Sequence, residues 1–140
     1  MNTYIRYAGG AQFEAMVRGH RIVADQPVDN GGQDAGPTPP ELLLASLGTC
    51  AGHYAVEYLR TRNLSTEGLS LHVFADKGAK PVHLSFFRVE VTIPDLSPKH
   101  REGLLRAVKA CLIHNTLRMS PVVEIEVNVA HAGEDLVAAG

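Results

Sequence analysis

The chain has few aromatic residues and no excess of positive charge, and each shortage excludes a class of function. Its 140 residues contain no tryptophan, and aromatic residues make up 6% of the total. So few rings cannot supply the stacking series that binds single-stranded nucleic acid. Lysine and arginine number 13 against 15 acidic residues, so there is no basic surplus for a phosphate backbone. We therefore expect no nucleic-acid partner.

The sequence also lacks a long uninterrupted hydrophobic run. Its longest apolar stretch, residues 42–59, is broken by polar side chains and two glycines, which is typical of a buried helix and not of a membrane span. The first ten residues do not have the charged-then-apolar order of a signal peptide. We expect a cytoplasmic protein without a membrane partner, in a compartment where thiols stay reduced.

Length and patterning predict one α+β domain over residues 1–140. Apolar and polar side chains alternate as in half-buried antiparallel strands at 13–17, 21–25, 69–75, 87–93 and 123–129. Capping and periodicity predict helices from residue 39 to about residue 60, from residue 98 past residue 108, and over 111–117. The stretch between Pro27 and Pro40 is rich in turn-forming residues and is expected to be a loop.

The first of these helices has a clear start. Thr38 takes the N-cap position, Pro39 the first helical position and Glu41 the third, where a carboxylate completes a capping box. The helix that follows is apolar nearly all round, so it must be covered on most sides. A chain with so few helices offers little cover, and a dimer that packs this helix against its symmetry mate would supply it.

The chain has only two cysteines, and each opens the same tetrapeptide, Cys-x-x-His. Cys50 is followed by His53, and Cys111 by His114, so each thiol has an imidazole about one helical turn away. Three interpretations are open. The cysteines form a thiol–disulfide redox pair, they join the histidines in a Cys2His2 metal site, or they are inert and buried in the core.

Longer segments around both cysteines resemble a known family. Residues 36–50, GPTPPELLLASLGTC, are similar to the first-cysteine motif of the osmotically inducible protein C and organic hydroperoxide resistance (OsmC/Ohr) family. Residues 111–117, CLIHNTL, are similar to its second-cysteine motif. The order of strands and helices fits as well, so the resemblance covers nearly the whole chain. It indicates a divergent, OsmC-like branch.

The resemblance implies both a fold and a function. The family fold is an intertwined homodimer with antiparallel sheets around long central helices and active sites at the dimer interface. Its known enzymes reduce organic hydroperoxides in oxidative-stress defence, so the resemblance implies a thiol-dependent peroxidase without a cofactor. Cys50 would attack the peroxide and Cys111 would resolve the product, with a small apolar hydroperoxide and an external dithiol reductant as partners. The alternative is a non-enzymatic small-molecule-binding stress protein with the same fold, and the metal site is a third option.

The glutamate that supports the first cysteine in the family's peroxidases is displaced in this sequence. The family places it ten residues before the cysteine, where this chain has Pro40. Glu41 lies nine residues before Cys50, and on an ideal helix nine residues rotate the side chain about 180° away. Glu41 is therefore expected to serve the capping box before any catalytic role.

The family's arginine, in a glycine-rich loop after the first strand, also has no counterpart here. Residues 8–11 read Ala-Gly-Gly-Ala. The attacking thiol needs a lowered pKa, so a cation must lie near it, or an imidazole that takes its proton. The candidates for this supporting role are Arg6, Arg18, Arg21, His53 and His114.

Overall fold

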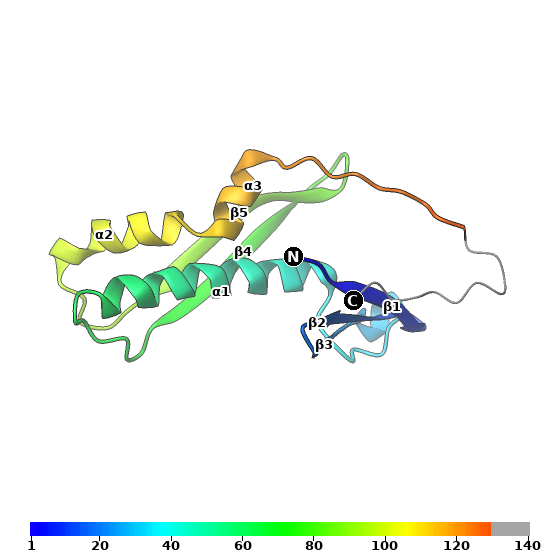
Figure 1. The fold of residues 1–140 in the computed structure, drawn as a ribbon, viewed down its shortest axis with the longest axis horizontal. Coiled ribbons are helices and arrows are strands. Elements are labelled where there is room, and N and C mark those ends of the chain that lie inside the picture. Colours follow the sequence, from blue (N-terminus) through cyan, green and yellow to red (C-terminus); the bar gives the residue numbers. More distant parts are fainter. Residues whose placement is uncertain (130–140) are drawn as a thin grey trace.

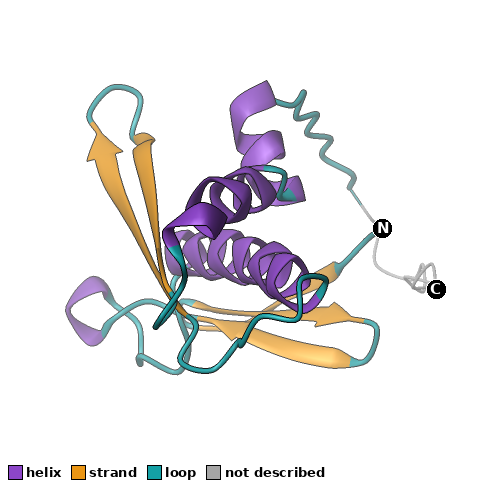
Figure 2. Ribbon diagram, turned by 90° about the vertical axis from the view of Figure 1, so that its left-hand side faces the viewer, coloured by secondary structure: helices purple, strands orange, loops and turns teal. Residues whose placement is uncertain are grey.

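The computed structural model describes residues 1–129, which contain three α-helices and five strands in two separate antiparallel sheets (Figures 1 and 2). In chain order the elements are β1 Tyr4–Gly9, β2 Gln12–Val17, β3 His20–Ala24, the single-turn helix η1 Val28–Asn30, α1 Pro39–Arg60, β4 Ser70–Gly78, β5 His83–Thr92, α2 Pro98–Lys109 and α3 Leu112–Met119. The predicted α+β class with antiparallel sheets is confirmed.

The N-terminal sheet has three strands in the order β1-β2-β3, and its first strand was not predicted. β1 folds back directly on β2 because Gly9 and Gly10 both adopt positive φ angles, 106° and 56°, which glycine alone adopts at little cost. One face of this sheet is apolar along all three strands and partly exposed. Its residues are Ile5, Tyr7, Phe13, Ala15, Ile22 and Ala24. We call it the apolar sheet face.

A buried carboxylate holds the loop that leads from this sheet to α1. Asp25 is only 1% exposed and accepts hydrogen bonds from the backbone amides of Gln26, Gln33 and Ala35 at 2.8, 3.1 and 3.0 Å. The Gln12 side chain donates a further bond at 3.2 Å. The amide of Ala35 lowers the pKa of Asp25 most, and the other donors add to it against the opposing effect of burial. The loop predicted between β3 and α1 is thus an ordered segment that delivers the chain to the helix start.

Helix α1 begins as the sequence predicts and lies close against β4. The Thr38 amide and hydroxyl donate to the Glu41 carboxylate at 2.7 and 2.8 Å, which confirms the capping box. The close approach depends on glycine, since a Cβ on Gly48 would lie 2.9 Å from Val73 Cγ2. Gly52, one turn further, faces β4 in the same way.

Helix α1 is covered on fewer sides than its composition suggests. The β4–β5 hairpin flanks one side of the helices (Figure 2), and the core forms where α1 meets α2, around Ala55, Tyr58, Leu59 and Leu104. One stripe along α1 is not covered by other described elements. Its residues, spaced four apart, are exposed: Glu41, Ala45, Thr49, His53 and Glu57. The expectation of an apolar surface nearly all round is therefore wrong along this stripe. Within residues 1–129, no helix is both long enough and apolar enough to cross a membrane.

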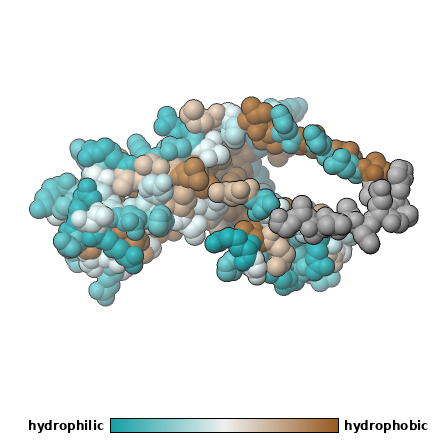
Figure 3. All heavy atoms as spheres, viewed as in Figure 1, coloured by the Kyte–Doolittle hydropathy of each residue, from teal (hydrophilic) through white to brown (hydrophobic). Residues whose placement is uncertain are grey.

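The last predicted strand, 123–129, is not a strand in this chain. Residues 120–129 leave α3 as an exposed segment that pairs with no other described strand (Figure 1). Its apolar side chains Val123, Ile125, Val127 and Val129 are more than three-quarters exposed and alternate with polar ones (Figure 3). The alternating pattern is present, but a strand also needs a neighbouring strand that forms hydrogen bonds with its backbone N–H and C=O groups. The tail expected after His131 lies outside the described residues.

Candidate functional site

The site begins with the placement of Cys50 in the middle of α1. Gly48 and Gly52, two residues to either side of it, face β4. Two helical residues span about 200°, so the Cys50 side chain points to the opposite side of the helix. There α1 packs against α3, and the Cys50 side chain is partly exposed.

Cys111 reaches the same place from the other side. Helix α2 ends at Lys109, and Cys111 follows in an extended conformation as the N-cap of α3. Its sulfur accepts a hydrogen bond from the His114 backbone amide at 3.4 Å, which is how a side chain caps a helix start. Cys111 is 0% exposed. The structure therefore brings the two thiols together, one reachable from solvent and one enclosed.

The surroundings of the two sulfurs shift their pKa values in opposite directions. Burial raises the pKa of Cys50, but hydrogen bonds from the Cys111 thiol and from the amides of Ile113 and Leu112 outweigh it and lower the pKa overall. Burial raises the pKa of Cys111, and the hydrogen bond and negative charge of Cys50 raise it further against the amides of His114 and Ile113. Cys50 therefore gives up its proton more readily than Cys111.

After the Cys111 thiol, the groups that lower the pKa of Cys50 belong to the N-terminus of α3. The first amides of a helix have no partner within the helix and carry partial positive charge. Leu112 and Ile113 occupy those positions, and their amides lower the pKa of Cys50. A thiolate held in this way needs no side-chain cation beside it.

The two histidines of the tetrapeptides occupy different surroundings. His53 is exposed, with its ring edge-on to Tyr54 at 5.9 Å between centroids. His114 is partly buried, and its Nδ1 has no hydrogen-bond partner among residues 1–129. Neither imidazole is among the groups that shift the pKa of Cys50.

The Cys2His2 metal alternative does not fit this arrangement. In the part of the chain that the structure describes, no three side chains of the cysteine, histidine and carboxylate types lie close enough to share an ion. A tetrahedral site needs four such ligands around one centre.

Comparison with known proteins assigns this arrangement of thiols and helices to a family. The model of the OsmC-like protein family matches residues 31–126, which include both cysteines and all three α-helices. The chain belongs to the OsmC-like family. No curated protein matches the sequence.

Solved structures of OsmC-like proteins share this fold at low sequence identity. A protein of Psychrobacter arcticus named for osmotic stress induction and a detoxification response is 22% identical, with a TM-score of 0.75 over 83% of this chain and 87% of that one. An organic hydroperoxide resistance protein OsmC from Legionella pneumophila is 20% identical, with a TM-score of 0.59 over 84% and 90%. An OsmC-like protein of Mycoplasma pneumoniae is 18% identical, with a TM-score of 0.67 over 84% and 86%.

The supporting residues expected from the OsmC-like resemblance lie elsewhere. Glu41 binds Thr38 at the start of α1. The Arg21 and Arg6 guanidiniums both bind Glu14 on the N-terminal sheet, through Nε atoms 3.0 and 2.9 Å from its oxygens, and Arg21 and then Arg6 lower the Glu14 pKa.

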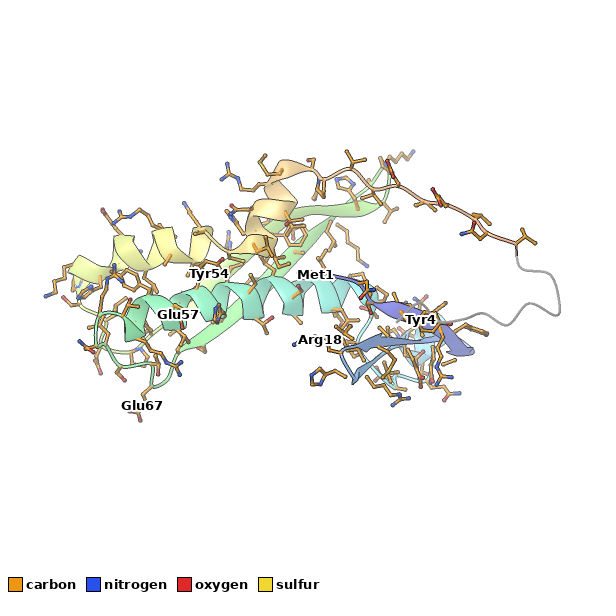
Figure 4. All side chains as sticks on the ribbon, in the orientation of Figure 1. Met1, Tyr4, Arg18, Tyr54, Glu57 and Glu67 are labelled. Carbon is orange, nitrogen blue, oxygen red and sulfur yellow. The ribbon has the colours of Figure 1, made fainter. Side chains whose placement is uncertain are left out.

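Arg18, the remaining arginine candidate, is exposed in the turn between β2 and β3. It has a positive φ of 48°. Figure 4 shows it on the side of α1 away from α3. Neither Arg18 nor any other arginine is among the groups that shift the pKa of Cys50.

Reasoning from the sequence missed the backbone groups that complete the site. We predicted a helix over 111–117 with Cys111 inside it, whereas Cys111 caps a helix that starts at Leu112. A cysteine directly before an apolar helical run can be an N-cap, and that was the available signal. The position of Cys50 beside that helix start could not be seen in sequence, because 61 residues separate the cysteines.

Proposed function

We propose that this protein reduces organic hydroperoxides to alcohols, with Cys50 as the attacking thiol and Cys111 as the resolving thiol. The Cys50 thiolate attacks the terminal peroxide oxygen, the O–O bond breaks, and the alkoxide leaves and takes a proton to become the alcohol. Cys50 is then a sulfenic acid. The Cys111 sulfur attacks it, water leaves, and a Cys50–Cys111 disulfide remains. An external dithiol returns the pair to the reduced state.

One observation carries this proposal: the two cysteines come together at the N-terminus of α3, with Cys50 partly exposed and Cys111 buried. A structural pair of buried cysteines needs neither a helix N-terminus that lowers the pKa of Cys50 nor a partly exposed cysteine. A peroxidase needs both, because only a reachable thiolate attacks peroxide. The names of the Legionella pneumophila protein and of other structural relatives, which refer to organic hydroperoxide resistance, support the same chemistry.

The surface beside Cys50 supports an organic substrate over hydrogen peroxide. The Leu112 amide lowers the pKa of Cys50, and Leu112 is 57% exposed. An exposed leucine whose amide acts on Cys50 offers apolar surface to the organic group of a hydroperoxide, and hydrogen peroxide has no group to cover it.

Consumption of a bulky hydroperoxide such as cumene hydroperoxide, measured with a dithiol present, tests the proposal. We expect turnover in the wild type and none in Cys50→Ser. Cys111→Ser is expected to complete a single turnover and then stop, because the sulfenic acid has no resolving thiol. His53→Gln is the matched control, because it changes the histidine of the same Cys-x-x-His tetrapeptide and leaves Cys50 in place. This variant is expected to turn over normally. A wild type that consumes no more than buffer would overturn the proposal.

We also propose a homodimer, on the ground of two apolar features that a second copy would cover. One is the apolar sheet face, and the other is segment 123–129, whose alternating side chains are ready for a strand. Exposed apolar areas of this extent are typical of an interface between protein chains.

Sedimentation of the full chain tests the dimer. We expect a dimer in the wild type and a shift toward monomer in Ile125→Asp, which charges the apolar side of the segment. Asn128→Asp adds the same charge on the polar side and is expected to remain dimeric. A wild type that sediments as a monomer at micromolar concentration contradicts the dimer.

A pocket on the apolar sheet face, whose lining includes neither cysteine, favours the second candidate function, non-enzymatic binding of a small molecule. It measures about 300 Å³ and is walled mainly by apolar side chains, among them Ile5, Phe13, Ile22, Pro39 and Leu42. If an apolar ligand is carried through purification and the thiols do not react with peroxide, the protein binds a small molecule and is not a peroxidase. For either function we propose a reducing compartment such as the cytoplasm, where the dithiol form persists.

A further inference from the structure

We propose that the reductant opens the Cys50–Cys111 disulfide by attacking Cys50, so that peroxide and reductant use the same sulfur through the same opening. This inference rests on the proposed redox pair. It concerns the reduction of the disulfide, for which the proposed function does not say which sulfur the reductant attacks. A thiolate can attack either sulfur of a disulfide, and which one it attacks depends on access and on the leaving thiol.

Access favours Cys50. Its side chain is partly exposed, whereas Cys111 is 0% exposed. The Cys111 amide donates to the Val108 carbonyl at 3.2 Å, and its sulfur accepts from the His114 amide at 3.4 Å. Both bonds tie Cys111 into the junction between α2 and α3. A thiolate that attacked Cys111 would have to separate these helices first.

Leaving-group chemistry alone favours the opposite choice, because the thiol of lower pKa leaves faster. The pKa of Cys50 is lowered and that of Cys111 is raised, so attack at Cys111 would release the better leaving group. A better leaving group speeds an attack that can take place, but it does not bring the reductant to an enclosed sulfur. We therefore infer that access decides the first step.

The difference in pKa between Cys50 and Cys111 then assists the second step, in which the mixed disulfide on Cys50 is resolved. When the reductant thiolate bonds to Cys50, the S–S bond breaks and Cys111 leaves as a thiolate, which takes up the proton that the reductant thiol gave up. Burial, the largest cause of the raised pKa of Cys111, persists in the mixed disulfide and slows the return attack of Cys111 on it. The second thiol of the reductant releases its proton to solvent, attacks the reductant sulfur in the mixed disulfide and completes the reductant's own disulfide. Cys50 leaves as the thiolate that the α3 amides stabilise.

The reaction with 5,5′-dithiobis(2-nitrobenzoate) tests this order without any peroxide, because disulfide exchange at Cys50 follows the same path in reverse. Folded Cys111→Ser is expected to form one stable adduct, mapped to Cys50 by mass spectrometry. Folded Cys50→Ser is expected to form none until a denaturant exposes Cys111. The wild type is expected to release two nitrothiobenzoate ions and to end with the internal disulfide and no adduct.

A direct measurement on the wild type does not depend on either variant folding. The oxidised protein is treated briefly with 2-mercaptoethanol, quenched with acid and mapped. We expect the mercaptoethanol adduct on the peptide that contains Cys50. An adduct on the Cys111 peptide, or equal reaction of folded Cys50→Ser, overturns the inference. A Cys50 adduct in a protein that consumes no hydroperoxide would reject the proposed peroxidase alone, while a Cys111 adduct in an active peroxidase would reject this inference alone.

Discussion

Replacing Leu112 with alanine should change which peroxides the protein prefers without changing the thiol. The substitution keeps the backbone amide that faces Cys50, so the thiolate stays stabilised. It removes most of an exposed apolar side chain beside the sulfur. We expect slower reduction of cumene hydroperoxide and unchanged reduction of hydrogen peroxide.

The size of this effect follows from the exposed surface. Burial of a whole leucine side chain is worth about 1.5–3 kcal/mol. Since Leu112 is 57% exposed, a bound organic group that covers it gains at most about 0.9–1.7 kcal/mol. Alanine keeps one of the four side-chain carbons, so the loss is about 0.7–1.3 kcal/mol, or roughly three- to ninefold in kcat/KM.

The ratio of kcat/KM for cumene hydroperoxide to that for hydrogen peroxide measures this effect and cancels differences in active concentration. Leu105→Ala is the matched control. Leu105 is 52% exposed on α2 and, unlike Leu112, does not act on the pKa of Cys50, so its replacement should leave the ratio unchanged. Sedimentation of both variants shows whether the oligomeric state has stayed the same.

Two outcomes would refute the reasoning about Leu112. An unchanged ratio would mean that the organic group does not contact this side chain. An equal fall in both rates would mean that the substitution disturbs the thiolate itself. In the second case the rate of Cys50 alkylation would fall as well, which separates the two outcomes.

Three further predictions concern the groups that build the site. Cys111→Ala removes a hydrogen-bond donor from the Cys50 thiolate, so the pH midpoint of Cys50 alkylation by iodoacetamide should move upward; an unchanged midpoint would show that the Cys111 thiol contributes nothing. Asp25→Asn should lower the free energy of unfolding at neutral pH. The Asp25 pKa lies below its ordinary value of 3.8 in the folded protein, so its contribution is present above that value and is lost as pH falls through the lower folded pKa. Urea titrations of the wild type and this variant should therefore differ at neutral pH and approach each other as the pH falls below 3.8, and the exposed Asp34→Asn should match the wild type throughout. Thr38→Ala should cost about 1 kcal/mol in the same titration through loss of the cap, with Cys50 alkylation unchanged.

The start of α1 and the β4–β5 hairpin were predictable because their signals are local. Thr38, Pro39 and Glu41 stand within four residues of one another, and side-chain alternation is visible along each strand. β1 was missed because its pairing with β2 depends on the turn at Gly9 and Gly10. Segment 123–129 has the pattern of a strand without a neighbour in the described chain, since a sequence pattern can indicate a strand but cannot provide its partner.

The sequence by itself predicted the family and the α+β class, and it pointed to Cys50 and Cys111 as the candidate site, since each depends on residue types at short spacings. Only the tertiary structure decided which groups lower the pKa of Cys50. The arginines and histidines that the sequence offered as candidates are absent from these groups, and the Cys111 thiol and the amides of Ile113 and Leu112 act in their place. Every residue except proline carries the same backbone N–H, so the sequence cannot mark one as functional. A backbone amide such as that of Leu112 becomes functional only when α1 and α3 pack together and bring a helix N-terminus close to one sulfur.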